Sequence, residues 1–206
     1  MYTKLILNYD YASLEPYIDA HTMGLHYNKH YLGYLKNLNN LLAKNNYNYE
    51  YDLRDLVYHL DMFNKQDLEN IKFNLGGVLN HELYWNSVSP KKNNVPVKSI
   101  KVAIENKYQN YENFKTAFTE TAMSLKGSGY TFLVLKPNND IEIVNTTNQH
   151  TPYMDNDVPL MTLDMWEHAY YINYENNKKE YIENFFDIVD YENINRVYED
   201  NKKIIA

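Results

Sequence analysis

The stretch "AHTMGLHYNKHYLGYLKNLNNLLAK", residues 20–44, repeats apolar and aromatic side chains at the spacing of an α-helix. We therefore predict one long helix here and a second over 66–85, which contains the paired glycines Gly76 and Gly77. Glycine inside a helix costs about 1 kcal/mol relative to alanine. Its usual justification is the close approach of another helix. The two helices are predicted to form an antiparallel hairpin, with a short helix over 51–62 between them.

The second half of the chain changes in pattern. The polar, turn-rich "KKNNVPVKS" after Pro90 is the candidate boundary between two domains, 1–90 and 91–206. Strand patterns follow, with β-branched and aromatic residues in "GSGYTFLVL" and period-two alternation in "DIEIVNTT". The predicted fold is α+β, a helical hairpin domain followed by a domain with a three-stranded antiparallel sheet flanked by helices. The elements predicted after the boundary are helices at 97–106 and 111–125, strands at 127–135, 140–147 and 158–164, and helices closing the chain over 167–200.

Composition narrows the function classes. The chain has 206 residues, no cysteine and a net charge of −7. The absence of cysteine removes disulfides, thiolate metal sites and cysteine nucleophiles. The negative charge argues against a nucleic-acid partner, although a local field can still attract a small anion. We find no apolar run of membrane-spanning length and no signal-peptide pattern at the start, so the sequence predicts a cytoplasmic protein without a membrane partner.

Four side chains with metal-ligand chemistry fall at positions that the predicted hairpin and strand could bring together. His26 lies early in the first helix and His81 late in the second, so an antiparallel hairpin would place them side by side. Asp164 and His168 lie where the third strand ends and the next helix begins. Three imidazoles and one carboxylate suit manganese, iron or zinc.

The spacing alone leaves a plainer interpretation open. A histidine on an amphipathic helix is more often a structural group than a ligand, and Asp-x-x-x-His is frequent by chance. The aromatic side chains around these positions would ordinarily be assigned to the core. They are Tyr34, Trp85, Trp166 and Tyr171.

Five ordered motifs distinguish the two interpretations. They are "LEPYIDAHTMGLHYNKHYLGYLKNLN", "NLGGVLNHELYW", "GSGYTFLV", "NTTNQHTP" and "DMWEHAYYINY". Together they cover nearly the whole chain, and the chain resembles the iron/manganese superoxide dismutase family. The last motif is close to the family's highly specific Asp-x-Trp-Glu-His-Ala-Tyr-Tyr signature.

The resemblance implies a function and a site. It implies conversion of superoxide to dioxygen and hydrogen peroxide by one-electron cycling of a single manganese or iron ion, with a solvent molecule as fifth ligand. It implies that Glu167 reaches the partner subunit's His168 across a homodimer interface, with a tetramer as the alternative assembly. The implied metal ligands are His26, His81, Asp164 and His168. The implied outer residues are Gln149 beside the bound solvent, His30, Tyr34 and Tyr171 at the substrate gate, and Trp85 and Trp166 as a shield against water.

Two features refine the resemblance. Manganese-type members carry the outer glutamine in the Asn-Gln segment and glycine on the helix, as Gln149 and Gly77 stand here, so manganese is favoured over iron. Some positions depart from the family pattern. The resemblance therefore does not tell how tightly the aromatic cage packs around the metal or how the substrate is guided to it. Tyr130 and Phe132 stand where the family has tryptophan. Lys126 stands in place of a phenylalanine, Lys178 in place of an arginine, and His150 in place of an aspartate.

Two other functions use the same ligands. A metal-binding structural protein with an idle redox site is the leading alternative, and a zinc hydrolase is the third. The loss of a ligand or of Tyr34 would have favoured the first, and neither is lost. The hydrolase would need a general base near the bound solvent, and the predicted direction of Glu167 takes it away from there.

Overall fold

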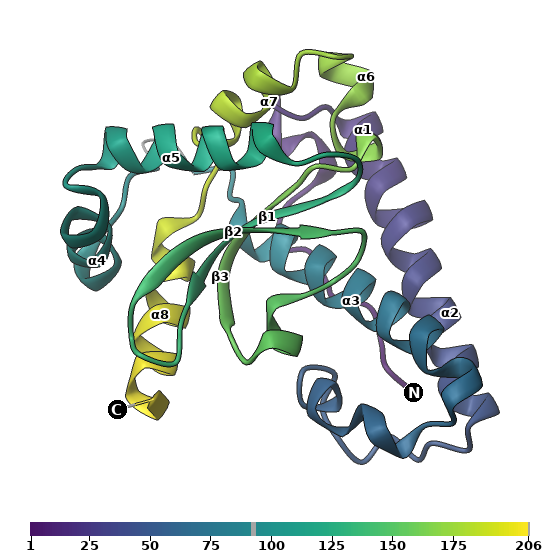
Figure 1. Cartoon of the computed structure of the whole chain (residues 1–206). Coiled ribbons are helices and arrows are strands. Elements are labelled where there is room, and N and C mark those ends of the chain that lie inside the picture. Colours follow the sequence, from purple (N-terminus) through teal and green to yellow (C-terminus); the bar gives the residue numbers. More distant parts are fainter. Residues whose placement is uncertain (92–93, 206) are drawn as a thin grey trace.

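The computed structural model describes residues 1–91 and 94–205, the last three of these by their backbone only. The fold is α+β, as predicted, with a helical hairpin followed by a three-stranded sheet and further helices. In Figure 1 the hairpin helices run along one side of the molecule and the sheet lies in the middle, with α4 and α5 on its other side. Lys92 and Asn93, within the predicted domain boundary, lie outside the described residues.

The first arm of the hairpin is one helical rod built from three segments. After a 3₁₀ turn at Tyr11–Leu14, α1 spans Ala20–Leu25, a π-helical segment spans His26–Tyr31, and α2 spans Leu32–Lys44. The Asp19 side chain caps the start by accepting the Thr22 N–H at 2.5 Å. The long helix predicted here is confirmed, but its centre is π-helical. Such wider turns are frequent at functional sites, and this one begins at His26.

The second arm is α3, Lys65–Ser87, which follows a 3₁₀ helix at Asp55–Met62. The Asn64 side chain caps α3 by accepting the Asp67 N–H at 2.9 Å. The two arms pack side by side, as Figure 1 shows for α2 and α3. Their facing apolar side chains belong to one buried core, which includes Leu35, Leu38, Leu42, Ile71, Leu75 and Val78.

The paired glycines of α3 are explained by two different close approaches. A Cβ at Gly77 would lie 2.6 Å from the Tyr34 ring of α2, so the predicted approach of another helix is confirmed there. A Cβ at Gly76 would lie 1.9 Å from the Gln149 carbonyl oxygen. That neighbour belongs to a loop of the second half of the chain. The prediction was therefore incomplete, since Gly76 admits a backbone that the helix pattern could not reveal.

The second half places a fully buried strand at the centre of the sheet. The strand order is β2-β1-β3 and both pairings are antiparallel. Every residue of β1 is buried, whereas in β2 two residues are buried, three are half-buried and two are exposed. Helix α3 packs along β3, and α5 packs against β1 and β2. The elements are α4 (Lys98–Tyr108), α5 (Tyr111–Ser124), β1 (Gly129–Leu135), β2 (Ile141–Thr147) and β3 (Val158–Asp164).

The helices predicted over 167–200 form, but in separate pieces. Glu175 interrupts them with a left-handed backbone (φ 49°). Val189 interrupts them again by forming a β-bridge with Val88 of the hairpin half. In the part of the chain that the structure describes, no helix is both long and apolar enough to cross a membrane. The pieces are a 3₁₀ turn at Glu167–Ala169, α6 (Tyr171–Tyr174), α7 (Lys178–Phe185) and α8 (Tyr191–Ile205).

Candidate metal centre

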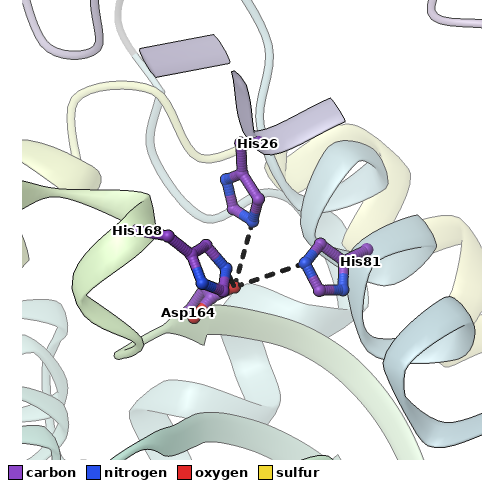
Figure 2. Close-up of side chains that lie close together, drawn as sticks. All are labelled: His26, His81, Asp164 and His168. Atoms are coloured by element: carbon purple, nitrogen blue, oxygen red, sulfur yellow. Dashed lines mark hydrogen bonds and ion pairs between the residues drawn. The ribbon is translucent and has the colours of Figure 1, made fainter. Parts of the chain in front are cut away.

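Four side chains from four different elements converge at one buried point (Figure 2). His26 begins the π-helical segment, His81 lies on α3, Asp164 ends β3, and His168 lies in the 3₁₀ turn after it. One ligand atom from each lies within 4.8 Å of all the others. The hairpin contributes two of these residues and the second half of the chain two. The antiparallel hairpin predicted from the sequence therefore brings His26 and His81 together, with ring centroids 4.9 Å apart.

The Asp164 carboxylate is the centre of the group. Its Oδ2 lies 3.1 Å from His26 Nε2, 3.3 Å from His168 Nε2 and 3.8 Å from His81 Nε2. Its Oδ1 accepts the backbone N–H of Trp166 at 2.8 Å. The turn after β3 therefore holds one carboxylate oxygen, which leaves the other to face the imidazoles.

His81 turns a nitrogen lone pair toward the point where the four side chains meet. His81 Nδ1 lies 2.6 Å from the Gly77 carbonyl oxygen, which can only accept, so Nδ1 carries the proton. Its Nε2 then has a free lone pair. The Nε2 atoms of His81 and His168 are buried, and neither has a hydrogen-bond partner among the described residues. Buried polar atoms without partners are rare in folded proteins, and a metal ion would satisfy both.

The charge states fit a cation. Burial lowers the pKa of His26 to about 4 and that of His81 well below its usual value, so both rings stay neutral near pH 7. Burial alone would raise the pKa of Asp164, but His168 and His26 more than offset it and hold this pKa far below its usual range. The group therefore offers imidazole lone pairs and one carboxylate charge, a donor set for manganese, iron or zinc.

Gln149, Tyr34 and His30 lie beside this group. Gln149 Nε2 donates to the Tyr34 hydroxyl at 3.0 Å, and the Tyr34 ring lies 5.3 Å from that of His81. The His30 ring stacks on the His168 ring, with centroids 3.9 Å apart. Gln149 is buried, whereas His30 and Tyr34 are half-buried. His30 and Tyr34 therefore extend from the buried centre to the partly exposed surface.

The two tryptophans also border the centre, but they differ in burial. Trp85 is buried, and its ring lies 4.7 Å from that of His26. Trp166 is half-buried, and its ring stacks 5.8 Å from that of His168. Its Nε1 donates to the Asn148 carbonyl at 3.1 Å, which ties the loop before Gln149 to the turn after β3.

Glu167 and Tyr171 lie on the surface of the single chain, unlike the residues described so far. The spacing alone would assign Tyr171 to the core, yet its side chain is 49% exposed in the single chain, and Glu167 is exposed as well. The contact of Glu167 with a partner subunit stays a prediction. Ile172, next to Tyr171, is 50% exposed, so an apolar surface lies close to the centre.

Sequence reasoning missed two side chains, Asn80 and Tyr181, whose hydrogen bonds hold the backbone around the centre in place. Asn80 Nδ2 donates to the carbonyls of Gln149 and His150, at 3.3 and 3.2 Å. Tyr181 donates to the Asp164 carbonyl at 2.9 Å. Asn80 stood in a motif that resembles the family, which was its available signal. Tyr181 lies far along the chain and offered none.

The departures from the family pattern fall in different surroundings. Tyr130 and Phe132 are fully buried in β1. His150 pairs with Asp155 at 2.8 Å on the exposed surface. The Lys178 ammonium lies 5.9 Å from the centre of the Tyr170 ring.

Two family models match the two halves of the chain. The iron/manganese superoxide dismutase α-hairpin domain matches residues 1–89, and the C-terminal domain of the same family matches residues 96–197. A manganese superoxide dismutase of Listeria innocua is 36% identical, over 94% of this chain and 95% of its own length. Manganese superoxide dismutase 2 of Bacillus anthracis is 34% identical, over 93% of this chain and 92% of its own.

Proposed function

Because the chain belongs to the iron/manganese superoxide dismutase family, we propose that it disproportionates superoxide at one manganese or iron ion. One observation carries the proposal. Four ligand atoms, from both halves of the chain, lie within 4.8 Å of one another in a buried site with a single carboxylate charge. The proposed ligands are His26, His81, Asp164 and His168.

A manganese or iron ion held by His26, His81, Asp164 and His168 would supply one-electron redox chemistry, oxidising one superoxide and reducing a second. The sum is two superoxide anions and two protons converted to dioxygen and hydrogen peroxide. Asp164 offsets part of the ion's charge, and the neutral imidazoles leave the rest to attract an anion. The negative net charge of the chain does not oppose this, because the local field at the centre is that of the ion.

Tyr34 is suited to deliver a proton. Its oxygen accepts from Gln149 Nε2, so its own hydroxyl proton is free to be donated elsewhere. Burial raises the pKa of Tyr34, which keeps the hydroxyl protonated near neutral pH. We propose that Gln149 holds Tyr34 and the metal-bound solvent, while Tyr34 and His30 form the gate.

The surroundings of Gly77 support manganese. The alternative arrangement places the outer glutamine on this helix, but any Cβ at position 77 would lie 2.6 Å from the Tyr34 ring. This close contact favours an amide supplied from the loop, where Gln149 stands. The relatives described above are named as manganese enzymes. We propose manganese as the favoured ion and iron as the alternative.

We further propose a homodimer, in which Glu167 reaches the partner subunit's His168 and Tyr171 completes the gate beside this interface. The exposure of Tyr171 and Ile172 beside His168 supports this interface. A tetramer built from two such dimers is the alternative assembly, and a cytoplasmic location stays a prediction of the sequence. A structural protein with an idle redox site is not favoured, because the relatives named above are superoxide dismutases.

The test is metal content per subunit, measured on protein purified without added metal, with superoxide removal assayed on the same sample. We expect about one manganese or iron ion per subunit and activity that scales with it. Reconstitution of metal-free protein with each ion then identifies the preferred one. Zinc alone without activity, or activity without any bound metal, would refute the proposal.

A further inference from the structure

A row of three aromatic side chains leads from the metal centre to the surface through the hairpin half of the chain. The centre of the Trp85 ring lies 4.7 Å from that of His26, one of the proposed ligands. The Tyr27 ring lies 6.1 Å from that of Trp85, and the Tyr11 ring lies 6.0 Å from that of Tyr27. Trp85 and Tyr27 are buried, whereas Tyr11 is half-buried. The row therefore begins beside the centre and ends at a phenol that solvent reaches.

The chemistry of these rings suits the movement of single electrons. Cysteine thiolates are readily oxidised, but this chain has no cysteine. In their absence, tryptophan and tyrosine are the side chains that lose one electron most readily. An electron crosses several short gaps between rings faster than it crosses the whole distance in one step, because the rate falls exponentially with distance. Three oxidisable rings in sequence can therefore pass electrons between the surface and the centre.

The hydrogen-bond partners of the rings decide where an oxidised ring comes to rest. Trp85 Nε1 is buried and has no hydrogen-bond partner among the described residues, so an oxidised indole has no group to which it can release its proton. Tyr27 donates its hydroxyl proton to the Leu5 carbonyl, which is a poor base. The Tyr11 oxygen accepts from Asn28 Nδ2 at 3.0 Å, and its own proton can pass to solvent. A neutral phenoxyl radical therefore forms most easily at Tyr11.

We propose that Trp85, Tyr27 and Tyr11 form an exit path, which carries oxidising equivalents from the metal centre to the surface. The inference rests on the proposed function, because hydrogen peroxide, the product of that reaction, is the oxidant. An oxidising equivalent that stayed at the centre would damage the His26 ligand or the Trp85 indole. An electron supplied from Tyr11 prevents this damage.

The electrons and protons of the path balance. Peroxide that takes one electron from the reduced ion splits into hydroxide and a hydroxyl radical. The radical takes an electron from Trp85 and becomes hydroxide. Tyr27 returns an electron to Trp85 and receives one from Tyr11, which releases its proton to solvent. The products are water, hydroxide and the Tyr11 phenoxyl radical, which recovers its hydrogen atom from a dissolved thiol.

Trp166 is the competing site of oxidation. It is half-buried, and its ring lies 5.8 Å from that of His168. Trp85 lies closer to its neighbouring ligand, at 4.7 Å from His26, and it has Tyr27 as the next ring outward. We therefore expect the radical to reach Tyr11 rather than to stop at Trp166.

The experiment treats reduced, iron-loaded protein with hydrogen peroxide and a spin trap, and peptide mass spectrometry then locates the trapped radicals. Iron is used because its divalent ion splits peroxide in one-electron steps. Tyr27→Phe interrupts the path, since a phenylalanine ring is much harder to oxidise. Tyr191→Phe is the matched control, because it also removes a buried hydroxyl, one that bonds to Tyr111 at 3.2 Å outside the row. We expect trapped radical on Tyr11 in the unmodified protein and in Tyr191→Phe. In Tyr27→Phe most of it should be lost, and oxidised Trp85 should increase.

Equal trapping on Tyr11 in Tyr27→Phe and in the unmodified protein would overturn the inference, as would trapping confined to Trp166. If Tyr27→Phe does not fold, Tyr11→Phe takes its place. Oxidation of Trp85 should then rise, and an unchanged level would overturn the path. Failure of the proposed function would show before peroxide is added, because the unmodified protein would bind no iron or remove no superoxide, and the inference would fall with it. Normal superoxide removal without trapped radical on Tyr11 would overturn the path alone.

Discussion

Two buried carboxylates, Asp67 and Asp164, are held in opposite ways. Donors from the hairpin surround Asp67, with Lys44 Nζ at 2.6 Å and the amide nitrogens of Asn45 and Asn64 both at 3.1 Å. The side chains that face Asp164 Oδ2 are imidazoles, and His81, which is neutral and protonated on Nδ1, turns the lone pair of its Nε2 toward the same point. The chain satisfies the first carboxylate by itself, whereas the second lies among imidazoles whose Nε2 atoms at His81 and His168 have no hydrogen-bond partner among the described residues.

The difference separates a structural carboxylate from a ligand. Both have a lowered pKa and both are buried, so neither property alone identifies the metal centre. What distinguishes them is the neighbouring atoms. A carboxylate among donors needs nothing further, whereas one among lone pairs needs a cation. Substitutions on the two sides should therefore have effects of different kinds.

The largest effect is expected from His81→Ala. It removes one of four proposed ligands and leaves a hole next to Asp164, so the protein should lose its metal ion almost completely. Metal content per subunit measures this directly, and superoxide removal should fall with it. His21→Ala is the control, because His21 is exposed and lies outside the cluster. Full metal content in His81→Ala would show that the ligand assignment is wrong.

The next effect is on the packing that joins the hairpin to the Gln149 loop. Gly76→Ala would place a Cβ 1.9 Å from a backbone carbonyl that cannot simply rotate away. We expect a loss of about 3 kcal/mol in the free energy of unfolding, at the upper end of overpacking costs. Denaturant titration measures it.

Gly33→Ala is the matched control on the other arm. Nothing lies within 4 Å of the Cβ that it adds in α2. Alanine in a helix should therefore stabilise the protein by up to about 1 kcal/mol. Equal destabilisation by both substitutions would mean that the close approach to Gln149 has no special role.

Tyr34→Phe should change turnover without changing the ligands. The substitution removes the free hydroxyl proton but keeps the ring against Gly77, so metal content and unfolding free energy should stay near those of the unmodified protein. We expect turnover to fall by about tenfold, less than the loss of a dedicated general acid. Pulse measurements of superoxide decay, normalised to bound metal, test this. Loss of metal in this variant would instead give Tyr34 a structural role.

The sequence predicted most of this architecture because its signals are local. Helical spacing placed His26 and His81 on two long helices, and the strand that ends at Asp164 was predicted with its observed bounds. The sequence could not show contacts between segments that lie far apart along the chain. Two of these contacts, Gly76 against Gln149 and the Tyr130 hydroxyl beside His81, depend on how the two halves pack. The third, Tyr181 with the Asp164 carbonyl, depends on how α7 packs against the end of β3. The interruptions after residue 167 were missed for the same reason, since Val189 leaves the helix to pair with Val88.

The smallest effect should come from Asp67→Asn, and it should depend on pH. Hydrogen bonds from Lys44 and Asn64 lower the pKa of Asp67 below its ordinary value of 3.8. The stability that this carboxylate contributes is therefore complete above the unfolded-state pKa and is lost as the pH falls through the folded-state pKa. The melting temperature of the unmodified protein should exceed that of Asp67→Asn by a constant margin at neutral pH, and the margin should close below 3.8.

Metal content separates this variant from those at the centre. Asp67→Asn should keep its ion at neutral pH, because the donors around position 67 are all supplied by the hairpin. A margin that persists unchanged into acid would mean that the Asp67 charge contributes nothing and that its shape alone matters. Loss of metal in Asp67→Asn would break the distinction between the two carboxylates, since the hairpin tip would then be coupled to the centre through the length of α3.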